Sequence, residues 1–332
     1  MDSKIGIIGI GAWATALAIM LANNQTPVVM WSHEIDTVEE IRKKFENQKY
    51  LPNVVIPNSV EITNEKEKLT DCQLIVQAVP TQYIRRILEE INIDLCNKKI
   101  VNVAKGIEKT KLKRVSEILS DFGIFEKNYA VLSGPSHAEE VARMGPTAVV
   151  VASTNLDFAV EVQKLFTNAH FRVYTSTDVV GCELGGALKN VIAIAAGIID
   201  GLQLGDNSKA ALITRGLAEI TRLGVAMGAK PSTFSGLSGL GDLIVTCNSK
   251  YSRNRYVGQQ IALGHALSDI LNNMNAVAEG VDTTISAHLL SFRYNVELPI
   301  AQKVYQILFE NLNPKDAVIS LMLRETKPEY WW

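Results

Sequence analysis

The chain has 332 residues, which is enough for two domains with separate cores. Hydrophobic residues make up 47% of it and charged residues 20%, and 33 basic against 35 acidic side chains give a formal net charge of −2. This near-neutral balance argues against a nucleic-acid partner, because no field of one sign would attract it.

The four cysteines are far apart and form no C-x-x-C pair. We therefore expect neither a disulfide framework nor a bound metal, and we expect a cytoplasmic protein. The apolar stretch at residues 191–199 is far shorter than the ~20 residues that span a bilayer, so the sequence predicts no membrane insertion.

The N-terminal residues have the pattern of a strand, a glycine turn and a helix. The apolar run Ile5–Ile8 leads into Gly9-x-Gly11-x-x-Ala14. In a dinucleotide-binding unit, the first glycine permits the tight turn, the second lets the backbone approach a pyrophosphate, and a small third residue lets the helix pack on the strand. A plain strand-to-helix turn can carry the same glycines, but a second apolar run, Val28–Trp31, follows at the spacing that a dinucleotide site requires.

The first half alternates short β-branched runs with helical stretches, which is typical of a parallel, doubly wound sheet. Strands are expected at residues 5–8, 28–31, 74–79, 100–103, 130–132 and 148–151, and helices at 12–21, 36–45, 82–91, 112–119, 138–143 and 157–166. After about Thr177 only long helical patterns follow, at 183–199, 210–227, 252–262, 284–291 and 300–309. We therefore expect a Rossmann-like domain over residues 1–177 and an all-α domain over 178–332, with the site between them.

Three expected strands of the first domain end in polar turns. Pro80 follows the run at 74–79, Lys105 follows the run at 100–103, and Ser133-Gly134-Pro135-Ser136 follows the next run. Open α/β sheets bind ligands at this carboxyl edge. Lys105 is thus either a group of the site or an ordinary surface lysine.

Lys189 interrupts a helix that is apolar nearly all round. Lysine is rarely buried without a partner, and burial lowers its pKa, so a desolvated lysine in a cleft is a candidate general acid or base. The alternative is a side chain that extends to solvent from the end of the helix.

Two further segments carry polar side chains at expected helix starts. A helix beginning after Gly241 would place Asp242 and Thr246 on one face, where Asp242 either pairs with a lysine or only caps the helix. The next helix opens with Ser252-Arg253-Asn254, which combines a cap, a guanidinium and a helix N-terminus and could bind a phosphate.

Together these segments resemble the NAD(P)-dependent sn-glycerol-3-phosphate dehydrogenases of the bacterial type. The similarity covers nearly the whole chain. It rests on the order and spacing of the runs at residues 132–136, 185–193, 212–216, 239–243, 252–254 and 277–280.

The resemblance implies reversible hydride transfer at C2, reducing dihydroxyacetone phosphate to sn-glycerol 3-phosphate for phospholipid synthesis, with NADP(H) or NAD(H) as cofactor. It also implies a second domain like the C-terminal domain of 6-phosphogluconate dehydrogenase, and a homodimer. By family role, Lys189 is the general acid/base, with Lys105 and Asp242 as its catalytic partners. The implied substrate-binding residues are Lys105, Gly134, Ser136, Asn190, Asp242, Thr246, Ser252, Arg253 and Asn254. The implied cofactor-binding residues are Gly9, Gly11, Ala12, Trp13, His33, Lys105, Ala138, Arg253, Val277 and Glu279.

Some positions depart from the family pattern. Ala12 stands where a serine is common, and His137 replaces the usual aromatic residue. An acid at the end of the second strand would bind the ribose 2′-OH and repel a 2′-phosphate. That strand ends in Trp31-Ser32-His33-Glu34, which favours NADP(H) with NAD(H) tolerated, although Glu34 could take the 2′-OH instead.

Two other readings of the sequence stay open. One is another dehydrogenase of the β-hydroxyacid or 6-phosphogluconate type, and the other is a non-catalytic dinucleotide-binding protein. The aromatic C-terminal end, residues 329–332, is expected to pack on the helical domain.

Overall fold

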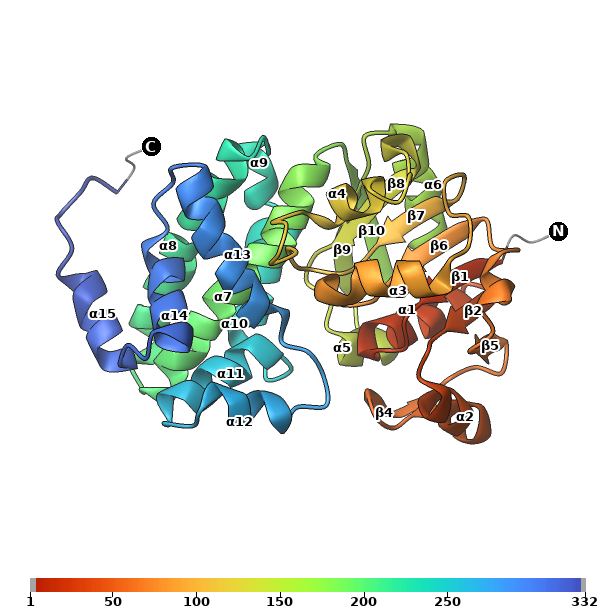
Figure 1. Cartoon of the computed structure of the whole chain (residues 1–332), viewed down its shortest axis with the longest axis horizontal. Helices are drawn as coiled ribbons and strands as arrows, with labels where there is room; N and C mark the ends of the chain where they lie inside the picture. The colour runs from red at the N-terminus through yellow and green to blue at the C-terminus, as the bar shows by residue number, and fades with distance from the viewer. Residues whose placement is uncertain (1–3, 330–332) are drawn as a thin grey trace.

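Eight strands form one sheet within residues 4–329, the part of the chain that the computed structural model describes. The strand order is β10-β9-β8-β7-β6-β1-β2-β5, and the first domain lies beside a helical second domain (Figure 1). The strands are β1 (Ile5–Ile8), β2 (Val28–Trp31), β5 (Val60–Thr63), β6 (Leu74–Gln77), β7 (Lys99–Asn102), β8 (Tyr129–Ser133), β9 (Thr147–Ala152) and β10 (Phe171–Ser176).

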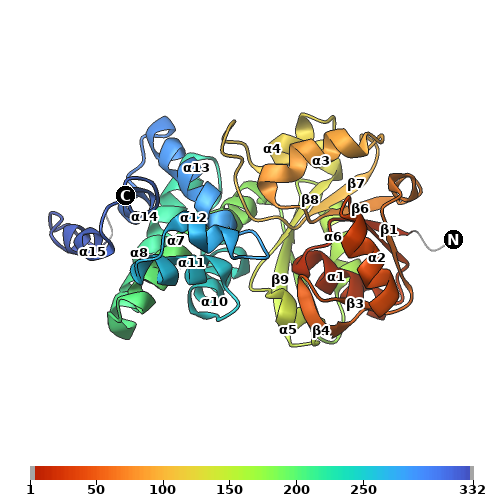
Figure 2. The same cartoon turned by 60° about the horizontal axis from the view of Figure 1, so that its bottom comes forward.

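Helices cover both faces of this sheet, as the doubly wound prediction requires. Ile5 and Ile7 pack into one core with α1 and α6, whereas Ile8 packs into a second core with α3 and α4. Figure 2 shows α3 and α4 along one side of the sheet and α1 on the other. The helices of this domain are α1 (Ala12–Asn23), α2 (Ile35–Lys44), α3 (Ile84–Ile91), α4 (Val115–Ser120), α5 (Ala138–Ala142) and α6 (Leu156–Phe166).

The sheet differs from the prediction at one strand pair and at its two edges. β9 runs antiparallel to β8, because the connection between them holds only the five-residue α5, about 8 Å long, which is too short to carry the chain back across the sheet. Strands β5 and β10 were not predicted. In the edge strand β10, buried Phe171 and Val173 alternate with exposed Arg172 and Tyr174, so β10 has no continuous apolar run.

A short antiparallel hairpin of β3 (Glu46–Asn47) and β4 (Leu51–Val55) follows α2 and was not predicted either. Tyr50, in the turn of this hairpin, lines a cavity that the glycine turn after β1 also lines.

The second domain is built around one buried helix, α7 (Val179–Gly201), which packs against α8, α10, α11, α13 and α14. The predicted all-α architecture is confirmed. Its other elements are α8 (Gly205–Ala226), α9 (Pro231–Phe234), the π-helical turn η4 (Leu237–Gly241), α10 (Asp242–Asn248), α11 (Arg253–Ala262), α12 (Leu267–Asn272), α13 (Glu279–Arg293), α14 (Pro299–Phe309) and α15 (Pro314–Met322). The aromatic residues 330–332 lie outside the described residues.

Helix α7 has the length and hydropathy of a membrane span, a longer apolar segment than residues 191–199 alone indicate. In the structure it is completely buried by its neighbours, as the core helix of a domain is. Its backbone meets α11 directly. A Cβ at Gly197 would overlap the carbonyl oxygen of Arg255, and a Cβ at Gly258 would overlap that of Ile194. The two helices are therefore held together without intervening side chains.

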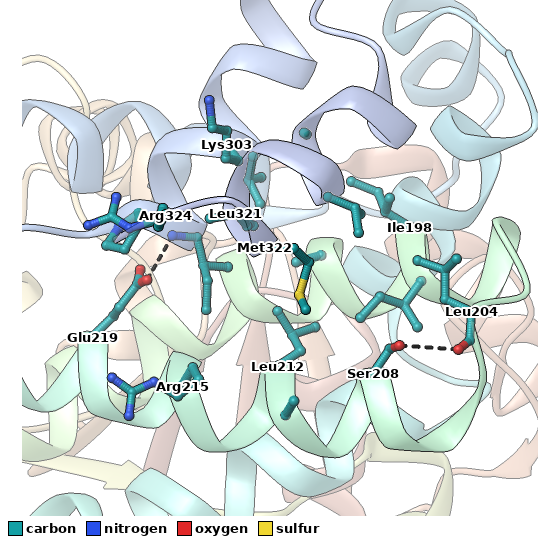
Figure 3. A pocket seen from close by; sticks show the side chains of 18 of the residues that line it. Ile198, Leu204, Ser208, Leu212, Arg215, Glu219, Lys303, Leu321, Met322 and Arg324 are labelled. Carbon is teal, nitrogen blue, oxygen red and sulfur yellow. Dashed lines mark hydrogen bonds between the residues drawn. The ribbon is translucent and has the colours of Figure 1, made fainter. Parts of the chain in front are cut away.

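A cavity of about 430 Å³ lies between α7, α8, α14 and α15, with mostly apolar walls (Figure 3). At one end, the buried Glu219 carboxylate accepts hydrogen bonds from the backbone N–H groups of Ile300 (2.7 Å) and Ala301 (3.2 Å). Glu219 thus caps the first turn of α14. Burial raises the pKa of Glu219 to about 7, although these two hydrogen bonds oppose the shift.

This carboxyl should make stability depend on pH. Its folded-state pKa of about 7 lies above the ordinary value of 4.5, so the stability it contributes is complete below about pH 4.5 and is lost as the pH rises through about 7. Glu219→Gln cannot ionise and should therefore lose less stability than the wild type between about pH 5 and pH 8. Thermal unfolding at both pH values measures this, with the exposed Glu310→Gln as control. Parallel pH curves for Glu219→Gln and the wild type would contradict the assignment.

Candidate active site

The glycine turn after β1 opens onto a cavity of about 350 Å³ that reaches both domains. Gly9 adopts φ +121°, a conformation that side chains disfavour, and its N–H donates to the Trp31 carbonyl at 2.9 Å. The first domain contributes Gly11, Ala12, Trp13 and His33 to the walls, and the second domain contributes Arg253, Val277 and Glu279. Seven predicted cofactor-binding residues thus join Gly9 around one cavity.

The cavity fits the pyrophosphate part of a dinucleotide. Gly11 is the N-cap of α1 but has no side chain to cap it, and the space that a Cβ would occupy at Gly11 is open. An uncapped helix N-terminus attracts an anion. Trp13 Nε1 is buried and finds no hydrogen-bond partner among the described residues. The N-terminus of α1 could hold the phosphates of a bound cofactor. The Trp13 indole N–H could donate a hydrogen bond to a cofactor atom next to them.

The Glu279 carboxylate joins the domains beside this cavity. Its Oε1 accepts from the backbone N–H of Thr81 at 2.8 Å, and its Oε2 accepts from that of Lys105 at 3.3 Å. Thr81 follows the end of β6 and Lys105 follows β7, so one side chain of α13 fixes two strand ends of the first domain.

Two lysines share one buried carboxylate at the domain boundary. Lys189 is 5% exposed and Asp242 is 1% exposed. The Lys189 Nζ donates to Asp242 Oδ1 at 2.5 Å and to Thr246 Oγ1 at 2.6 Å. The Lys105 Nζ donates to Asp242 Oδ2 at 2.8 Å. The alternative of an outward-pointing Lys189 is thus excluded, and Asp242 pairs with lysines instead of capping α10.

Burial and the charges of the Lys105–Asp242–Lys189 triad set the protonation states of Lys189 and Asp242. Burial lowers the pKa of Lys189 to about 8, and the positive charge of Lys105 adds to this shift while Asp242 opposes it. Burial disfavours the ionised form of Asp242, but the two lysines outweigh that effect and hold the pKa of the carboxyl below its usual range. The arrangement therefore keeps an ionised carboxylate next to an ammonium that can exchange its proton near neutral pH.

The strand-end loops and α7 position Lys105. Its Nζ also donates to the Gly134 carbonyl at 2.9 Å and lies 3.5 Å from Ser136 Oγ. The Asn190 side-chain amide donates to the Lys105 carbonyl at 3.0 Å. Gly134, Ser136 and Asn190 therefore lie together around Lys105.

Three predicted site residues have other contacts in the structure. Ser252 caps α11 by accepting from the Arg255 N–H at 3.2 Å, and Asn254 Oδ1 accepts from the Gly280 N–H at 3.0 Å. Both side chains are buried and hold α11 in place. Ala138 packs in the core of the first domain and is not among the residues that line the cavity.

The structure also brings in residues that were not among the predicted site residues. Ser133 Oγ and His137 Nε2 are buried without a hydrogen-bond partner in the described part of the chain. The His137 ring lies 6.0 Å from that of Tyr251, and burial, with the two lysines, lowers the pKa of His137 to about 4. Tyr50 and Arg86 line the cavity. No sequence signal marked Tyr50, whereas Pro80, three residues after the end of β6, lines the same cavity as Arg86 and marked this edge of the sheet in the sequence.

Comparison with known proteins identifies the family. Residues 4–159 match the family described as NAD-dependent glycerol-3-phosphate dehydrogenase N-terminus, and residues 178–319 match the corresponding C-terminus. The chain belongs to the NAD-dependent glycerol-3-phosphate dehydrogenase family. The other dehydrogenase families considered from the sequence are thereby set aside.

Individual relatives within the glycerol-3-phosphate dehydrogenase family agree with this assignment. The chain is 51% identical to the glycerol-3-phosphate dehydrogenase (NAD(P)+) of Prosthecochloris aestuarii over 98% of this chain and 99% of that one. It is 49% identical to the Bacillus subtilis enzyme of the same name, covering 97% and 94%. The crystal structure of glycerol-3-phosphate dehydrogenase from Coxiella burnetii superposes with a TM-score of 0.92 at 36% identity, covering 97% of this chain and 99% of that one.

Proposed function

We propose that this protein catalyses the reversible reduction of dihydroxyacetone phosphate to sn-glycerol 3-phosphate with a nicotinamide cofactor. The observation that carries the proposal is the pairing of the half-buried Lys105 and the buried Lys189 with the buried Asp242 carboxylate, beside a cavity that fits a dinucleotide. A scaffold that only bound a dinucleotide would have no use for two lysines on one carboxylate at the domain boundary.

The bound cofactor supplies or accepts the hydride at C2 of the substrate. When the carbonyl is reduced, negative charge grows on its oxygen, and the Lys189 ammonium both stabilises this charge and donates the proton. Asp242 orients the ammonium and keeps it charged, while Lys105 polarises the carbonyl. In the oxidation direction, neutral Lys189 takes the alcohol proton.

Other roles follow from position. Gly134, Ser136, Asn190 and Thr246 lie around the two lysines and would contact the substrate. Ser252 and Asn254 would act through the placement of α11. We also propose that the two domains divide between residues 177 and 178. The protein would be a cytoplasmic homodimer that supplies glycerol phosphate for phospholipid synthesis.

An assay of NADPH and NADH oxidation with dihydroxyacetone phosphate tests the reaction directly. Hydroxy-acid and keto-acid substrates serve as the comparison. Turnover with dihydroxyacetone phosphate well above that with the acids is expected. Equal or better turnover with the acids would overturn the proposal.

Arg253 should bind the remote phosphate of the substrate. It opens α11 and lines the cavity, and its Nη1 donates to the Val277 carbonyl at 3.3 Å. Arg253→Ala should raise the KM for dihydroxyacetone phosphate by roughly 10- to 100-fold, the value of a charge-assisted contact, with a smaller fall in kcat. Steady-state kinetics measure this, with the exposed Arg293→Ala as control. An unchanged KM would show that Arg253 does not contact the phosphate.

A further inference from the structure

The Glu34 carboxylate, which follows β2, already accepts hydrogen bonds from side chains of this chain. Glu34 accepts hydrogen bonds from Lys49 Nζ at 2.6 Å, from Tyr50 Oη at 2.9 Å and from Thr37 Oγ1 at 3.0 Å. Lys49 and Tyr50 belong to the turn between β3 and β4, so the unpredicted hairpin holds the acid. The ion pair with Lys49 cancels its charge, and Thr37 fixes its orientation from α2.

The other groups at this end of the cavity are donors or cations. Ser32 and His33 follow β2 directly, and Arg86 faces the same cavity from α3. Arg86 is exposed and has no ion-pair or hydrogen-bond partner among the described residues. The carboxylate that lines this end, Glu34, is the one neutralised by Lys49.

A free acid after the second strand of a dinucleotide fold selects NAD(H), because it accepts the ribose hydroxyls and repels a 2′-phosphate. Here both properties are weakened. Both Glu34 oxygens already accept hydrogen bonds from side chains of this chain, and the Lys49 ammonium at 2.6 Å opposes the negative charge. A 2′-phosphate would meet hydroxyl, imidazole and guanidinium groups instead.

We propose that the Glu34–Lys49 pair sets the cofactor preference of this protein toward dinucleotides that carry a 2′-phosphate, with Ser32, His33 and Arg86 facing that phosphate. The inference rests on the proposed function only in taking the cavity as the cofactor site. Lys49 acts as a positioning residue, since it lies behind Glu34 and compensates its charge.

Equilibrium binding of NADPH and NADH, followed by protein fluorescence without substrate, tests this. The wild type should bind NADPH at least about tenfold more tightly than NADH. Lys49→Met leaves Glu34 uncompensated and should raise the Kd for NADPH about tenfold, with a change under about threefold for NADH. Lys49→Met combined with Glu34→Gln should restore the NADPH affinity, because the uncompensated charge is then gone. Lys43→Met, which breaks an exposed pair with Glu39 on α2, controls for net charge.

Tighter or equal binding of NADH by the wild type would overturn the proposal. So would an unchanged NADPH-to-NADH ratio in Lys49→Met, or a large loss of NADH affinity in Glu34→Gln alone, since that loss would mean that Glu34 binds the ribose. Failure of the proposed function gives a different result: neither cofactor would be oxidised with dihydroxyacetone phosphate, whatever the binding ratio.

Discussion

Lys189→Met is expected to lower kcat for dihydroxyacetone phosphate reduction by roughly 10³- to 10⁴-fold, because the reaction loses its proton donor and the cation that stabilises the forming alkoxide. Methionine fills a similar volume in the apolar helix, so the fold should persist. The Kd for NADPH should stay within about threefold of the wild type, because Lys189 is not among the residues that line the dinucleotide cavity. Near-normal kcat would remove the proposed acid/base role.

The pH profile gives an independent readout of Lys189. Reduction needs the ammonium, so with a pKa of about 8 its kcat/KM should fall as the pH rises through about 8, and oxidation should rise over the same range. Lys189→Ala should lose the pH dependence near 8 in both the reduction and the oxidation direction. Added ethylamine should restore part of its rate, which would not happen if the defect were purely structural. The exposed Lys164→Met is the matched control and should behave like the wild type.

Asp242→Asn should both destabilise the protein and lower its activity. It leaves two ammonium groups with no counter-charge between them, and breaking a buried pair in this way costs about 3–5 kcal/mol of unfolding free energy. Without the carboxylate, the pKa of Lys189 should fall further, so the loss of the reduction rate should begin at lower pH than in the wild type. Denaturant unfolding and the pH dependence of kcat/KM measure the two effects.

A second substitution separates charge from packing at this position. Adding Lys105→Met to Asp242→Asn removes one of the two facing cations and should recover part of the lost stability. Asp282→Asn, which breaks the more exposed pair with Lys109, should cost under about 1 kcal/mol. If Asp242→Asn were as mild as this control, the carboxylate would not hold the triad together.

The elements that sequence predicted well are those with continuous apolar patterns. β1, the glycine turn and α1 follow from short-range spacing, and the apolar helix around Lys189 made burial one of two alternatives, which the structure decides. The i, i+4 relation of Asp242 and Thr246 also follows from one helix. These features are local, so a single segment contains the information that specifies them.

The rest depends on contacts between distant segments. The edge strand β10 alternates buried with exposed residues because one side meets solvent, and β9 runs antiparallel to β8 because the connection between them holds only the short α5. Ser252 caps its helix, as the sequence indicated, but Asn254 accepts from a backbone N–H 26 residues away, which its sequence position does not indicate. The engagement of Glu34 by the hairpin could not be predicted without the hairpin itself.

The direct backbone contact between α7 and α11 bears on which metabolites the site accepts. Lys189 lies on α7 and Arg253 begins α11, and at Gly197 and Gly258 no side chain separates the two helices. The main-chain contact therefore fixes the spacing of the two backbone segments that carry Lys189 and Arg253. If Arg253 binds the substrate phosphate as proposed, this spacing would disfavour compounds whose carbonyl and anionic ends lie at a different distance, even when their functional groups are the right ones.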